Sequence, residues 1–195
     1  MRVGLDVSPF LQTRAGTARY LRQVVPLSDV RFAFGGRGRG WVVARDAVWY
    51  PLVLARQAEH ARVDVLHCPT FRGPLRARVP LVVTVHDLAV LRHPETFNRW
   101  TREYSRAAVP AVVRAARLVI AVSEFTRREL RELLRVPEER VRVVPNGVER
   151  VFGADGPRAD GDYVLAVGTL EPRKNLARLA EAARAATAAV YEEVA

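Results

Sequence analysis

Residues 80–87 read PLVVTVHD, and this stretch sets the expectation for the fold. From Leu81 to Val85 nearly every side chain is apolar, without the alternation of a strand that has one face in water. Such continuity is typical of a parallel sheet buried on both faces. Five further stretches predict strands: RVGLDV (2–7), VRFAF (30–34), VDVLHC (63–68), RLVIAVS (117–123) and RVRVVP (140–145).

Helical stretches separate most of these strands. They are TARYLRQVV (17–25), YPLVLARQAEHA (50–61), NRWTREYSRAAVPAVVRAA (98–116) and EFTRRELRELL (124–134). Ser123 is a good N-cap for the last of them, because its hydroxyl can accept from a free backbone N–H. The alternation predicts an α/β domain over residues 1–150, a doubly wound, Rossmann-like parallel sheet with helices on both faces.

The rest of the chain has a different composition. Residues 151–162 are rich in Gly, Asp and Pro and predict an exposed linker. Residues 163–185, YVLAVGTLEPRKNLARLAEAARA, predict a buried strand, a turn and a helix, the start of a second α/β domain. Two elements cannot close a core, so this domain is incomplete. Residues 186–195 predict a C-terminal helix.

Composition limits the classes of protein. The chain has 195 residues and one cysteine, Cys68, which cannot form an internal disulfide. It has no apolar run of about 18 residues, the length of a membrane span, and its start lacks the apolar core of a signal peptide. We therefore expect a cytoplasmic protein. The net charge of +10 indicates binding to an anionic partner, and a general bias of the composition towards arginine explains it equally well. No aromatic side chains interleave with the arginines as on a base-stacking surface, which argues against nucleic acid.

Two candidate sites follow predicted strands of the first domain, where ligands of open α/β sheets bind. Gly16 precedes a helix and would let an anion approach backbone N–H groups, although a simple turn glycine explains it equally. His86 and Asp87 end the strand quoted above and could bind or move protons. The alternative for this pair is a hydrogen-bonded structural role.

The third candidate is GTLEPRKNL, residues 168–176. Lys174 is the single lysine, so the other 30 of the 31 basic residues are arginines (31 − 1 = 30). Arg173 and Lys174 stand at a predicted helix N-terminus, where the helix dipole disfavours cations. A bound anion such as a diphosphate would resolve the conflict, and solvated loop charges are the alternative.

Metal binding is not predicted. Asp160, Gly161 and Asp162 have a D-x-D form, but they lie in the linker. The four histidines lack zinc-ligand spacing. His67 and Cys68 are neighbours on a strand and point to opposite faces, which argues against a Cys–His nucleophile.

Several motifs together resemble glycosyltransferase family 4, which has the GT-B fold of two Rossmann-like domains. They are RAGTARY (14–20), LHCPTF (66–71), VPLVVTVHDLAVLRHPETF (79–97), VSEFTRRELRELLRVPEERVRVVPNGVERVF (122–152) and YVLAVGTLEPRKNLARLAEA (163–182). Their order and spacing, rather than any one motif, carry the resemblance.

The resemblance implies retaining transfer of a hexose of mannose or glucose type from a nucleotide-diphosphate sugar to a glycan or lipid-linked acceptor. No metal or other cofactor is implied. Gly16, Arg173 and Lys174 would bind the donor diphosphate, and His86, with Asp87, would be catalytic and face the transferred sugar. Secondary candidates are Thr169, Ser123 and Asn146.

The chain departs from the family pattern in two ways. Thr169 stands where many members have arginine, and the second-domain motif of two glutamates with seven residues between them is absent. Residues 186–195 resemble the family's last helix, as if the middle of the second domain were removed, although alanine-rich helices look alike. We therefore expect no activity from this chain alone, and a non-catalytic binding or structural module is the alternative function.

The arginines of residues 99–117 recur at helical spacing beside Trp100 and Tyr104. This pattern predicts either a peripheral contact with the inner face of an anionic membrane or a solvated helix face.

Overall fold

The structure is a computed structural model that describes residues 1–11, 16–36, 38–149, 153, 161, 164–168 and 174–194, with side chains described through residue 185. The chain forms two compact units, Met1–Gly147 and Val148–Ala195.

The strands are β1 (Val3–Asp6), β2 (Val30–Phe32), β3 (Val65–Cys68), β4 (Leu81–Val85), β5 (Leu118–Ala121) and β6 (Val141–Val143). The α-helices are α1 (Gly16–Val24), α2 (Arg39–Ala44), α3 (Leu54–His60), α4 (Ala89–Arg92), α5 (Arg99–Ala115), α6 (Glu124–Leu134) and α7 (Leu176–Val194). Short 3₁₀ helices are η1 (Ser8–Leu11), η2 (Val25–Leu27), η4 (Pro94–Thr96) and η5 (Glu138–Arg140), and η3 (Arg45–Val53) is a π-helix.

The six strands form one parallel sheet in the order β2-β1-β3-β4-β5-β6. All six lie within the predicted stretches, and the predicted α/β fold is confirmed. Val83 of β4 pairs with Cys68 of β3 on one side and with Val119 of β5 on the other. The carboxyl ends of all the strands therefore meet at one edge of the sheet.

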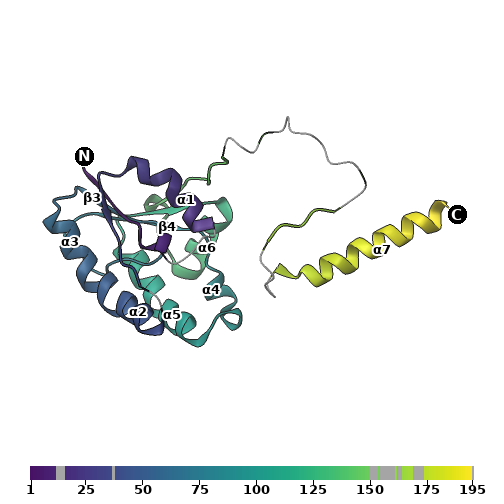
Figure 1. Cartoon of the computed structure of the whole chain (residues 1–195), viewed down its shortest axis with the longest axis horizontal. Helices are drawn as coiled ribbons and strands as arrows, with labels where there is room; N and C mark the ends of the chain where they lie inside the picture. Colours follow the sequence, from purple (N-terminus) through teal and green to yellow (C-terminus); the bar gives the residue numbers. More distant parts are fainter. Residues whose placement is uncertain are drawn as a thin grey trace. The chain divides into compact units, whose positions relative to one another are not determined.

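Helices cover both faces of the sheet (Figure 1). Thr84 points to one face, where the Tyr20 hydroxyl of α1 lies 2.9 Å from its Oγ1. Val83 and Val85 point to the other face, because side chains alternate along a strand. There they join a core cluster to which α5 contributes Val109, Val112 and Val113 and α6 contributes Leu130.

Side chains cap the N-termini of α5 and α6, and only the cap of α6 was predicted. Asn98 caps α5 by accepting from the N–H of Thr101, and Ser123 caps α6 by accepting from the N–H of Thr126. α5 continues through Pro110 as one helix.

The helical region before α3 was only partly predicted. The sequence indicated a helix over residues 50–61, whereas helical structure begins at Arg39 and includes the π-helix η3. At 3.6 residues per turn, Leu54 would lie about 2.5 turns after Arg45 and on the opposite face of an α-helix. The wider i→i+5 turns bring both residues to the buried face.

The second unit corrects one prediction. Residues 164–168 form no strand, and Val164, Leu165 and Val167 are 69%, 75% and 87% exposed instead of buried. A single strand has no neighbour to satisfy its backbone groups, which explains the difference. Residues 176–194 form one unbroken helix, α7, so the segment 186–194 continues the preceding helix.

Candidate functional site

A buried chain of hydrogen bonds lies near the carboxyl ends of β3 and β4. The Oγ1 atom of Thr84 lies 2.9 Å from the Tyr20 hydroxyl and 2.8 Å from Nε2 of His67. Thr84 is fully buried, and a buried hydroxyl needs such partners. Burial, and secondarily the nearby His86, lowers the pKa of His67 to about 4, so its imidazole is neutral at pH 7. The three side chains therefore tie α1 to the centre of the sheet.

His86 follows β4 and lies beside this chain of hydrogen bonds. Its Nε2 is 3.1 Å from the Pro69 carbonyl oxygen, and its ring makes a T-shaped contact with Tyr20 at a centroid distance of 5.0 Å. A carbonyl oxygen can only accept, so Nε2 carries the proton and Nδ1 keeps a free lone pair. Burial lowers the pKa of His86, although the Pro69 bond and Asp87 oppose this effect. His86 is thus a neutral imidazole in a fixed orientation.

The backbone at His86 is held from α6. The Thr126 hydroxyl donates to the His86 carbonyl oxygen over 3.2 Å, and Ser123 Oγ lies 3.0 Å from the same hydroxyl. Ser123, a secondary candidate, therefore stands next to the partner of His86 and also caps α6. Its hydroxyl joins the strand end of β5 to the strand end of β4.

The other predicted residues of the first domain lie at this edge with different partners. Asp87 is exposed and its Oδ1 accepts from the N–H of Ala89, so its hydrogen bond goes to the start of α4, and it acts on His86 only through its charge. Asn146 is exposed after β6. Gly16 begins α1, four residues before Tyr20, and an added Cβ there would meet no described atom within 4 Å. The described fold has no packing reason for glycine at that position.

A second polar network involves a buried carboxylate on η3. Asp46 accepts two hydrogen bonds from Arg45, at 2.7 and 3.0 Å, and one from Nε1 of Trp100 at 3.2 Å. Arg72 Nε lies 3.4 Å from Asp46, an ion pair without hydrogen-bond geometry, and its guanidinium lies over the ring of Tyr104. Burial, and then the charge of Asp46, raises the pKa of Tyr104 to about 12.

Asp6 is the last residue of β1, and its carboxylate binds the segment between β1 and α1 through hydrogen bonds. Its Oδ1 accepts from the backbone N–H of Ser8 at 3.1 Å and from the Ser8 hydroxyl at 2.5 Å, and its Oδ2 accepts from Tyr50 at 3.1 Å. Burial raises the pKa of Asp6, and the hydrogen bonds oppose that rise. The turn after β1 is therefore anchored to η3.

Lys174 belongs to the second unit. A Cβ added to Gly168 would lie 2.7 Å from Lys174 Nζ and 3.2 Å from its Cδ, so the lysine side chain folds over the glycine. Arg173 and Thr169 lie outside the described residues.

The sequence reasoning did not single out the residues that orient His86. Tyr20 and His67 lie inside quoted motifs, and Thr84 and Asp6 are the polar positions of otherwise apolar strands. A polar side chain in a strand buried on both faces signals a required hydrogen-bond partner. That signal could have identified Thr84 and Asp6, although not their partners.

The family assignment follows from comparison with known proteins. The family model described as Glycosyltransferase Family 4 matches residues 3–151, most of the chain. The chain belongs to glycosyltransferase family 4. The edge that carries His86 and Gly16 is therefore an edge of a glycosyltransferase domain.

One relative is the O-antigen chain mannosyltransferase B of Escherichia coli, 27% identical over 129 residues. The match covers 60% of this family 4 chain and 34% of the relative, so the chain spans about a third of that protein's length. Among the described helices, none has the length and apolar character needed to cross a membrane.

The buried His67 predicts a pH dependence of stability. Its pKa is about 4 in the folded chain and near its ordinary value of 6.5 after unfolding, so between these values the unfolded state binds more protons. Stability is therefore full above about pH 6.5 and falls towards pH 4, with a loss of about 1–2 kcal/mol at pH 5 from this residue.

His67→Gln keeps an amide N–H near Thr84 and removes the titration. Urea unfolding at pH 7.5 and pH 5 should show a smaller loss for this variant than for the wild-type chain. His60→Gln, at an exposed position at the end of α3, is the matched control. Equal pH profiles for wild type and His67→Gln would show that His67 is not responsible.

Proposed function

We propose that this chain is the acceptor-side domain of a family 4 enzyme, with the first residues of the donor domain. The reaction is retaining transfer of a hexose from a nucleotide-diphosphate sugar to a glycan or lipid-linked acceptor. The observation that carries the proposal is the fixed, neutral His86 at the carboxyl edge of the sheet, close to the start of α1 through Tyr20. A hexose of mannose type is supported by the name of the E. coli relative.

His86 would act on the transferred sugar through Nδ1. Because Nε2 donates to the Pro69 carbonyl, Nδ1 can accept a hydrogen bond from a sugar hydroxyl. The Tyr20 contact and the Thr126 bond restrict the ring and backbone, so this acceptor is in place before the sugar arrives. Such preorganisation favours the reacting geometry.

The donor diphosphate is the proposed partner of Gly16, Arg173 and Lys174. In the transfer, the bond between the anomeric carbon and the diphosphate oxygen breaks and its electron pair goes to the diphosphate. The acceptor oxygen bonds to the anomeric carbon, and the acceptor proton passes to the released diphosphate. Cations that meet the growing charge on the diphosphate stabilise the transition state more than the ground state.

Binding of nucleotide diphosphates tests this assignment. Titration of GDP and UDP by calorimetry should show weak binding that decreases with salt, because exposed charge contacts are screened. Lys174→Ala should weaken it by about fivefold, and Lys174→Arg should restore it only in part, since the donor geometries differ. Arg178→Ala, four residues after Lys174 and in the first turn of α7, is the control.

Gly16→Ala separates ligand binding from a structural role of the glycine. The added Cβ meets no described atom, so thermal stability should be unchanged or rise by about 0.5–1 kcal/mol from helix propensity. Binding of GDP and UDP should nevertheless decrease. If Gly16→Ala and Lys174→Ala both bind as the wild type does, the diphosphate assignment is wrong.

The alternative function is a non-catalytic binding or structural module derived from this family. Because the second unit contains one helix and no strand among its described residues, we expect no turnover by this chain alone. Incubation with GDP-mannose or UDP-glucose and a panel of lipid and sugar acceptors should give no product above background. Sustained product formation would contradict this expectation and exclude the module.

A peripheral contact with an anionic membrane is the proposed role of the outer face of α5. Arg99 and Arg106 are exposed, and Arg102 pairs with Glu103 over 3.2 Å. Trp100 is 45% exposed, although its Nε1 donates inward to Asp46. The location that we propose with this contact is the cytoplasm, at the inner face of the membrane. Each arginine near such a surface contributes about 1 kcal/mol.

Vesicle co-sedimentation tests the membrane contact. Vesicles with phosphatidylglycerol should bind the chain more strongly than neutral phosphatidylcholine vesicles. Reversing both Arg99 and Arg106 to Glu should weaken binding by about tenfold or more, whereas Arg131→Glu on α6 should have little effect. Equal sedimentation with the two kinds of vesicle would rule out an electrostatic contact.

A further inference from the structure

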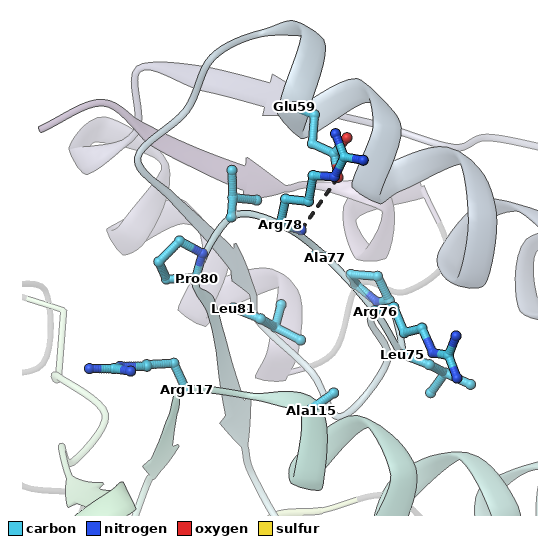
Figure 2. A pocket seen from close by; sticks show the side chains of 11 residues that line it. Glu59, Leu75, Arg76, Ala77, Arg78, Pro80, Leu81, Ala115 and Arg117 are labelled. Atoms are coloured by element: carbon cyan, nitrogen blue, oxygen red, sulfur yellow. Dashed lines mark hydrogen bonds between the residues drawn. The ribbon is translucent and has the colours of Figure 1, made fainter.

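A hollow of about 610 Å³ lies at the amino edge of the sheet, opposite the edge that carries His86 (Figure 2). Its walls are the end of α3, residues 74–81 and the end of α5. The volume is in the range of small-molecule sites. The hollow shares none of its lining residues with the polar networks described above.

The hollow exists because β3 and β4 are joined without a helix. A parallel connection usually contains an α-helix that covers the sheet. Here residues 69–80 make the connection as an irregular loop, held by a bond from the N–H of Arg78 to Glu59 over 3.3 Å. The space between the ends of α3 and α5 is therefore only partly filled.

The wall of the hollow contains apolar side chains between charged ones. Ala115 at the end of α5 and Pro80 before β4 are exposed, whereas Leu81 is only 3% exposed and forms the floor. Leu75 on the loop is 44% exposed. An exposed leucine beside such a hollow offers contact area to an apolar group of a ligand.

Three arginines line the hollow beside these side chains. In Figure 2 Arg78 extends towards Glu59, whereas Arg76 and Arg117 extend on opposite sides of the hollow, and none of the three guanidinium groups has a hydrogen bond or ion pair with a described residue. The acidic lining residue is Glu59, and one of its oxygens already accepts from the backbone of Arg78. Three positive charges against one negative charge leave the hollow cationic.

An interaction with the carbonyl groups at a helix C-terminus does not explain the position of Arg117. Free carbonyls at a helix C-terminus attract cations, and Arg117 follows the end of α5. However, Arg140 takes those carbonyls: its Nη2 donates to Val113 at 2.9 Å, to Arg114 at 3.0 Å and also to Ala116. Arg117 therefore remains available to a ligand.

We propose that the hollow is a second ligand site, which binds a small amphiphilic anion. The apolar body of the ligand lies on Leu75, Pro80 and Ala115, and its carboxylate, sulfonate or phosphate group meets the arginines that line the hollow. A guanidinium binds all three kinds of anion through paired N–H donors. The site does not depend on the glycosyl transfer proposed above.

The fluorescent probe 8-anilinonaphthalene-1-sulfonate tests the proposal, because it joins an apolar body to one sulfonate. Titration of the full chain should give saturable binding, and amide NMR shifts should change at Leu75, Ala77 and Leu81. Arg76→Gln combined with Arg117→Gln should weaken binding by about fivefold. Arg56→Gln, an exposed arginine of α3 outside the hollow, should not change it.

Two further measurements separate this site from non-specific apolar binding. N-phenyl-1-naphthylamine, the probe without the sulfonate, should bind the wild-type chain more weakly and be insensitive to the double arginine variant. Ala115→Trp should fill the hollow and abolish the NMR shift changes while thermal stability stays close to wild type. Equal binding of the two probes, or unchanged binding of the sulfonate by Ala115→Trp, would overturn the proposal.

Discussion

The hydroxyl of Thr84 is the interaction on which the arrangement of the candidate site depends. It is a polar group in the middle of an apolar sheet, so it must find hydrogen-bond partners inside the protein. It finds them in Tyr20 of α1 and His67 of β3. Tyr20 then presents its ring to His86, which fixes the imidazole against the Pro69 carbonyl. One buried hydroxyl thus couples the helix that begins at Gly16 to the histidine proposed to face the sugar.

The two edges of the sheet have different chemistry for a common reason. At the carboxyl edge, buried polar groups such as Asp6 and Asp46 are satisfied by neighbouring side chains, so their charges are not available to a ligand. At the amino edge, Arg140 satisfies the end of α5, and the short connection between β3 and β4 leaves a cationic hollow. Paired charges stabilise the fold, whereas unpaired charges remain available for ligands.

Much of the fold could be predicted from local pattern, and much of the site could not. The six strands and the caps Asn98 and Ser123 depend on apolar runs and on side chains three residues from their partners. The π-helix η3 was missed because it brings Arg45 and Leu54 to one buried face, a requirement that no local propensity describes. The predicted strand at residues 164–168 was wrong because an apolar sequence forms a strand only beside another strand.

The sequence by itself determined the parallel α/β fold, the family resemblance and the position of His86 at a strand end. These are properties of neighbouring residues and of their order along the chain. Only the tertiary structure decided that Asp87 bonds to the start of α4, that Tyr20, His67 and Thr84 form one network, and that a hollow opens beside Arg117. Such features depend on contacts between residues far apart in the chain, and hydrogen bonding and packing select those contacts only when the sheet has formed.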